Sequence, residues 1–173
     1  RSMKRQGTID SGVILLAILI VFSLPVMSVM AIPSGSEELT VLSTDFDPGS
    51  DPFEIEAGGS SQIQSTVENN QPFPIVVILE GISYSKQILN VPPGGTAETQ
   101  ITLSAPEEIG SHVRARSEHH YIGILPNSVI ITLHDIHPFV AMITITGVLL
   151  SPIAVLFYLI VGFRPIILRE ETR

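Results

Sequence analysis

Cysteine is absent from this chain of 173 residues, and lysine occurs only twice. Without cysteine the chain can form neither a disulfide bond nor a thiol nucleophile, so packing, partners or a membrane must stabilise the fold. No Asn-x-Ser/Thr sequence is present, which excludes N-glycosylation at that signal. Acid-rich surfaces with little lysine are typical of salt-adapted archaeal proteins.

Catalytic motifs are equally scarce. The sequence contains neither Gly-x-Ser-x-Gly nor His-Glu-x-x-His, the signatures of serine hydrolases and zinc proteases. Ser85 and Lys86 are adjacent on a strand that we expect to be exposed, whereas a catalytic Ser-Lys pair needs a buried, deprotonated lysine. We therefore expect no catalytic residues, no bound cofactor and no enzymatic activity.

Long apolar runs, in contrast, are present at both ends of the chain. Residues 11–36 and 138–163 carry almost no charge. About 20 apolar residues in a helix are enough to cross a bilayer core of about 30 Å. The sequence therefore predicts transmembrane helices at residues 11–32 and 138–163.

Charged residues indicate the orientation of these helices. Residues 33–137 contain fourteen acidic and three basic residues, for a net charge of −11, whereas the tails at residues 1–10 and 164–173 together carry +3. Cations beside a span resist translocation, so both tails should be cytoplasmic and residues 33–137 extracytoplasmic. The acidic excess argues against nucleic acid or anionic lipid as a ligand and favours cations or a basic protein partner.

The first apolar run has an alternative interpretation as a cleaved signal peptide. Residues 3–5 would be its basic start, residues 13–22 its apolar part and residues 29–31 its cleavage site. The continuation of apolar residues to Ile32 favours an uncleaved span. With cleavage, one anchor remains and the outer domain is unchanged.

The region between the spans has the pattern of an all-β sandwich. Short alternating segments are separated by turn sequences such as residues 47–52, 69–72 and 92–95. The continuous apolar run at residues 74–80 predicts a central buried strand. We expect residues 128–134 to be the last strand, and no helix between the spans.

Four segments carry a resemblance to a known kind of domain. They are the glycine pair at 58–59 before an alternating strand, the apolar strand from Ile75, the Pro-Pro-Gly-Gly turn at 92–95 and the corner at 105–110. In these segments the chain resembles prokaryotic surface immunoglobulin-like modules of the CARDB and NEW3 type, over about residues 53–118. The resemblance implies a seven- or eight-stranded sandwich with an adhesive, assembly or spacer role and no catalytic residues.

Histidines cluster near the second span. The candidate metal ligands are His119, His134 and His137, since imidazole nitrogens with nearby carboxylates bind Zn²⁺ or Cu²⁺. His119 and His120 are neighbours on a strand and so point to opposite faces, which disfavours joint binding of one metal. The alternatives are polar side chains in the headgroup region or a pH-sensing cluster.

A second candidate cation site lies in an acidic loop. Asp45, Asp47 and Asp51 could supply oxygen ligands to Ca²⁺. The spacing differs from the EF-hand loop, and Pro48 and Pro52 stiffen the segment. A solvated acidic loop is the alternative.

Small and polar residues form a stripe along the second span, at steps of three and four. Its members are Thr144, Gly147, Ser151, Ala154 and Tyr158. Small residues four apart let helix backbones approach closely, so the stripe predicts packing either against another subunit or against the first span. Pro25 and Pro152 should bend the two spans. Neither span contains a charged residue, which argues against an ion pathway.

These features predict an immunoglobulin-like ectodomain between two transmembrane helices. The expected function is that of a non-catalytic accessory or assembly subunit that presents an acidic domain to a membrane-protein partner. Self-association is the alternative form of partnership. The alternative functions are a juxtamembrane Zn- or Cu-binding or redox-accessory protein that uses the clustered histidines, and a cell-surface adhesin.

Overall fold

The computed structural model describes residues 7–45, 49–162 and 165–168. The described chain forms two compact units. One unit combines the N-terminal residues as far as Ser28 with the C-terminal residues from Ile143, and the other runs from Val29 to Met142. We call the first unit the helix pair and the second the β domain.

The helix pair contains most of the two long helices, α1 (Ser11–Ala31) and α3 (Pro138–Val161). Both helices are long and apolar enough to cross a membrane, with mean hydropathies of 2.8 and 2.3. The expected combination of β-sheet with a long apolar helix toward each end of the chain is confirmed. Pro25 lies inside α1 and Pro152 inside α3.

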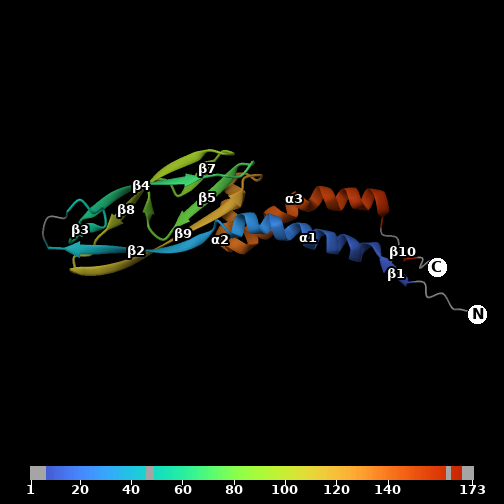
Figure 1. Cartoon of the computed structure of the whole chain (residues 1–173), viewed down its shortest axis with the longest axis horizontal. Helices are drawn as coiled ribbons and strands as arrows, with labels where there is room; N and C mark the ends of the chain where they lie inside the picture. The colour runs from blue at the N-terminus through green and yellow to red at the C-terminus, as the bar shows by residue number, and fades with distance from the viewer. Residues whose placement is uncertain (1–6, 46–48, 163–164, 169–173) are drawn as a thin grey trace, which may run out of the picture. The chain divides into compact units, whose positions relative to one another are not determined.

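The start of α1 and the end of α3 are joined by a short β-ribbon (Figure 1). Strand β1 (Gly7–Asp10) pairs antiparallel with β10 (Pro165–Leu168), with Gly7 opposite Leu168. The Ser11 hydroxyl donates a hydrogen bond to the Gly162 carbonyl oxygen at 2.9 Å, which ties the start of α1 to the end of α3. Both ends of the described chain therefore lie at the same end of the helix pair.

The β domain contains two sheets (Figure 1). The five-stranded sheet has the order β3-β2-β9-β5-β7, and the three-stranded sheet has the order β4-β8-β6. The strands of the first sheet are β2 (Gly35–Thr44), β3 (Glu54–Glu56), β5 (Ile75–Glu80), β7 (Ile88–Val91) and β9 (Gly110–Ile122). Those of the second are β4 (Ser60–Glu68), β6 (Ser83–Tyr84) and β8 (Thr96–Ser104).

Two apolar clusters join the faces of these sheets. One packs Val67 of β4 against Val77 and Leu89 of the larger sheet. The other packs Leu103 of β8 against Val41 of β2. The run at residues 74–80 forms the buried strand β5, which is paired on both sides, by β7 and β9. Because both faces of β5 are covered, its apolar residues need not alternate with polar ones.

The prediction of a strand at residues 128–134, with no helix between the spans, was wrong. These residues belong to α2 (Asn127–Ile136). Their β-branched side chains favour a strand locally. However, Pro126 immediately precedes the helix, and the two buried residues, Ile130 and His134, are four apart and so share one helix face. Burial of that face outweighs local propensity.

Candidate functional site

A groove of about 480 Å³ lies within the helix pair, between α1 and α3. Three small residues of the predicted stripe on α3 line this groove, namely Gly147, Ser151 and Ala154. The other two members, Thr144 and Tyr158, do not line it. The remaining lining residues are Leu19, Ile20, Ser23, Met27, Ile143, Thr146 and Leu150.

The serine hydroxyls of the groove are satisfied within their own helices. Ser23 donates a hydrogen bond to the Ile20 carbonyl oxygen, and Ser151 donates one to that of Val148, each at 2.8 Å. A Cβ added at Gly147 would meet no atom within 4 Å, so the space beside this residue is open. The groove therefore offers an apolar surface on which another backbone could approach closely.

A polar cluster lies in the β domain, where strand register brings its members together. In the pairing of β5 with β9, Ile78 is opposite His119 and Val76 is opposite Tyr121, while Glu80 ends the strand. Because side chains alternate along a strand, Glu80, His119 and Tyr121 share one face of the sheet. Helix α2 adds His134 to that face.

The distances within this cluster are short. Nε2 of His134 lies 3.1 Å from Oε1 of Glu80, and Nε2 of His119 lies 3.6 Å from Oε2 of the same carboxylate. The rings of His119 and His134 meet edge to face, with centroids 4.9 Å apart. The hydroxyl of Tyr121 lies 2.7 Å from Nδ1 of His134. Every polar atom of the buried His134 ring therefore has a partner.

The environment shifts two of these groups toward their neutral forms. Burial, assisted by the nearby His134, lowers the pKa of His119, although Glu80 acts in the opposite direction. Burial also raises the pKa of the Tyr121 hydroxyl, and the Glu80 charge adds to that shift. The lowered pKa of His119 favours the neutral imidazole, which is the form that binds a metal ion. By geometry the cluster offers two imidazoles and one carboxylate.

The structure brings together two of the three predicted metal ligands, His119 and His134. His137 lies outside the cluster, is exposed, and accepts a hydrogen bond from the Phe139 backbone N–H at Nδ1, at 3.1 Å. Sequence reasoning missed Glu80 as a third donor. Its position at the end of a predicted strand was visible, but its proximity to His119 depends on the β5–β9 register.

His120 lies on the opposite side of β9 from His119, as expected of neighbours on a strand. Its ring bonds to Oε1 of Glu118, and its backbone N–H donates to the Ser34 hydroxyl at 2.9 Å. The hydrogen bond with His120 lowers the pKa of Glu118. This hydrogen-bonded pair is separate from the metal-ligand cluster.

Of the candidate calcium loop, Asp45 and Asp51 are exposed, and Asp47 lies outside the described residues. Oδ1 of Asp51 accepts a hydrogen bond from the Phe53 backbone N–H at 3.0 Å, a contact that shapes a turn. Calcium binding by this loop stays a prediction.

Comparisons with protein-family models, curated proteins and solved structures found no match for this chain.

Proposed function

We propose that this chain is a two-pass membrane protein that associates, through its helix pair, with an apolar helix of a partner membrane protein. The groove between α1 and α3 is the observation that carries the proposal. Its small residues would allow the close backbone approach on which helix association in lipid depends. The chain would act as a non-catalytic accessory or assembly subunit.

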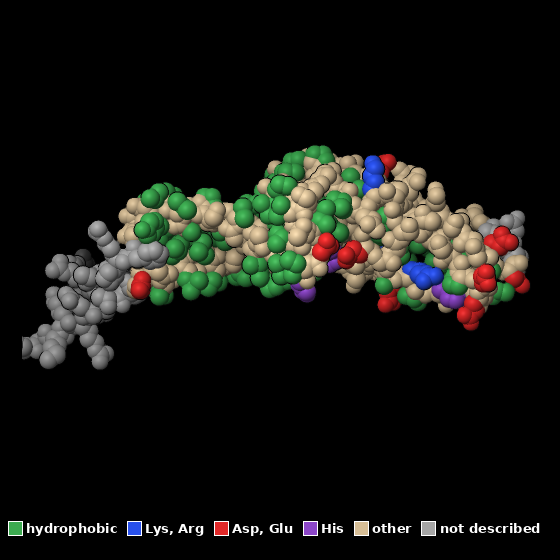
Figure 2. All heavy atoms as spheres, turned by 180° about the vertical axis from the view of Figure 1, so that it is seen from behind, with side chains coloured by type: hydrophobic (Ala, Val, Ile, Leu, Met, Phe, Trp, Pro, Cys, Tyr) green, Lys and Arg blue, Asp and Glu red, His purple; other side chains and the backbone are tan. Residues whose placement is uncertain are grey.

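The arrangement of the helix pair supports the proposed two-pass topology. The β1–β10 ribbon pairs residues 7–10 with residues 165–168, so the two ends of the described chain are adjacent, which supports an even number of spans. Cations in the tails favour a cytoplasmic location for them, and the acidic β domain would then be extracytoplasmic. On the face shown in Figure 2, apolar side chains dominate the helices, whereas acidic side chains gather on the β domain.

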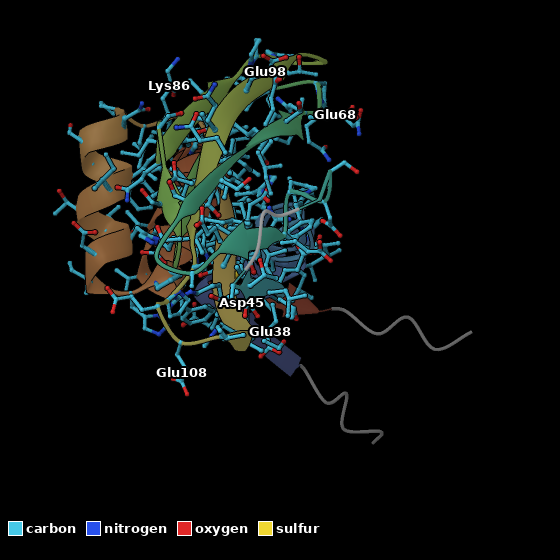
Figure 3. All side chains as sticks on the ribbon, turned by 90° about the vertical axis from the view of Figure 1, so that its left-hand side faces the viewer. Glu38, Asp45, Glu68, Lys86, Glu98 and Glu108 are labelled. Carbon is cyan, nitrogen blue, oxygen red and sulfur yellow. The ribbon has the colours of Figure 1, made fainter. Side chains whose placement is uncertain are left out.

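The β domain would contribute a second, polar contact with the partner. We infer an immunoglobulin-like sandwich of the CARDB and NEW3 type, a fold that the two packed sheets and their turn sequences support. Acidic side chains such as Glu68, Glu98 and Glu108 point away from the sheets (Figure 3). They would select a basic surface on the partner, and β4, an edge strand of nine residues paired only with β8 in the described chain, offers main-chain groups for strand addition.

Cross-linking in native membranes tests the proposal, because a chain without cysteine permits a unique attachment point. A photoreactive group would be attached at Ala154→Cys, which lines the groove, and at Leu159→Cys, a residue of α3 that is 73% exposed and does not line it. We expect a discrete protein adduct only from position 154. Adding Gly147→Leu, which fills the groove, should reduce that adduct about tenfold.

Three results would contradict the proposal: equal adducts from both positions, adducts with lipid alone, or no effect of Gly147→Leu. A second copy of the chain with a different tag distinguishes self-association from a partner. If the adduct contains the second copy, the partner role is wrong and the groove is an interface between copies.

A further inference from the structure

We propose that Glu80, His119 and His134 together bind one Zn²⁺ ion. This inference goes beyond the proposed function, and neither depends on the other. Two imidazoles and a carboxylate form a donor set that zinc uses in proteins where three protein ligands leave one position for water. Of the described residues, these three form the group whose geometry suits a metal ion.

The ligand atoms are already close to the separations that zinc requires. Metal–ligand distances of about 2.0–2.2 Å in a tetrahedral site place neighbouring ligand atoms about 3.3–3.6 Å apart. Oε1 of Glu80 lies 3.1 Å from Nε2 of His134, and Oε2 of the same carboxylate lies 3.6 Å from Nε2 of His119. No two of the three ligand atoms are more than 4.8 Å apart. A small rotation of His119, whose side chain is 21% exposed, would close the remaining gap.

Tyr121 would orient His134 from outside the ligand set. Without a metal, Nε2 of His134 donates to Glu80 while Nδ1 accepts from the Tyr121 hydroxyl. With zinc on Nε2, the ring proton moves to Nδ1 and is donated to the same hydroxyl oxygen. A hydroxyl serves both tautomers because it donates and accepts, and such outer contacts fix the ring of a metal-binding histidine.

Burial and charge favour a transition metal at this position. The side chain of His134 is only 4% exposed, whereas that of Glu80 is 50% exposed, so an ion could enter from the solvent side of the carboxylate. The single negative charge partly neutralises the ion. Two nitrogen donors favour Zn²⁺ over Mg²⁺ and Ca²⁺, which prefer oxygen ligands.

Calorimetric titration of the full chain in lipid nanodiscs with Zn²⁺ alone tests this site. We expect saturation at one ion per chain, without competition from a large excess of Mg²⁺. His119→Ala and Glu80→Gln should each weaken binding by more than about 100-fold, the upper range for loss of an outer contact. The side chains of His119 and Glu80 are only partly buried, at 21% and 50% exposure, so both variants should fold. Tyr121→Phe, which retains all three ligands, should weaken binding by about tenfold.

His112→Ala is the matched control, since His112 lies on the same strand β9 but bonds to the Glu108 carbonyl oxygen, away from the cluster. It should bind zinc as the wild type does. The site is refuted if the wild type shows no saturable binding, if His119→Ala and Glu80→Gln bind normally, or if His112→Ala loses as much affinity as they do. Replacement of Zn²⁺ by Co²⁺ should give the visible absorption bands of tetrahedral coordination, and their absence would contradict the geometry.

Discussion

The helix pair and the β domain differ in how much of their large apolar side chains is exposed. In α1 and α3, large apolar residues such as Val21, Leu156 and Leu159 are more than half exposed. In the β domain, Val77 and Leu103 are at most 1% exposed. Water penalises exposed apolar surface by roughly 25 cal/mol per Å², so the exposed apolar side chains of α1 and α3 support the proposal that lipid surrounds these helices.

An apolar residue therefore has a different role in each region. An apolar side chain of the β domain contributes to stability through a particular set of neighbours. In the proposed membrane topology, an apolar side chain on the surface of α1 or α3 would instead contact lipid, which accepts many apolar shapes. Substitutions at matched positions should therefore separate the two regions.

Truncation of a core leucine should have the largest effect. Leu103→Ala should lower the free energy of unfolding of the β domain by about 2–5 kcal/mol, because it removes buried contacts and leaves a cavity. Leu156→Ala, at a helix residue that is 58% exposed, should leave it unchanged. Pulse proteolysis in urea, on the full chain in nanodiscs, measures both. Equal losses would show that the two regions share one core.

A charge placed on the surface should distinguish the regions next. Val21 and Val113 are similarly exposed, at 64% and 59%, but lie in α1 and β9. Val21→Arg should oppose membrane insertion by about 2.5–3.5 kcal/mol, whereas Val113→Arg should change stability by no more than about 0.5 kcal/mol. The fraction that resists alkaline extraction from membranes reports insertion. Full retention of Val21→Arg would argue that α1 does not face lipid.

Acid should destabilise the β domain but not α1 and α3, because these helices contain no acidic, basic or histidine residue. Burial lowers the pKa of His119 in the folded chain, so this histidine binds a proton more tightly in the unfolded chain. The free energy of unfolding should therefore fall as the pH drops below about 6.5. The pKa of Glu118 is also lowered, by its hydrogen bond with His120, so a second loss begins below about 4.3.

The same proteolysis assay across this pH range provides the measurement. His119→Gln should flatten the curve near pH 6, whereas His112→Gln should not. If His119→Gln follows the wild-type curve, titration of His119 does not couple to folding.

The smallest expected effect concerns the ion pair between Arg116 and Glu37 on the surface of the β domain. Glu37→Gln should cost about 0–1 kcal/mol, and less at high salt, because water screens an exposed pair. A loss of several kcal/mol in the urea midpoint analysis would mean that this pair is more shielded than its exposure indicates.

The two regions also differ in how far the sequence predicts them. The long helices follow from local hydropathy, and both begin at the expected residues, Ser11 and Pro138. Turn sequences and the apolar run predicted the β-sheet content and β5. Helix α2 was missed because its β-branched residues favour a strand locally, while the burial that selects a helix comes from contacts with β5 and β9.

The polar cluster shows the same limit. His119 and His134 were visible as candidates from their residue type alone. Glu80 and Tyr121 join them only through the register of β5 with β9 and the placement of α2, and these depend on contacts distant in sequence.

Cysteine labelling of intact cells tests the proposed topology most directly. The chain has no cysteine, so Ser50→Cys in the β domain and Lys4→Cys in the N-terminal tail each provide one reactive thiol. With a membrane-impermeant maleimide, Ser50→Cys should be labelled on intact cells, and Lys4→Cys only after the membrane is opened. Labelling of Lys4→Cys on intact cells, with Ser50→Cys protected, would contradict the account.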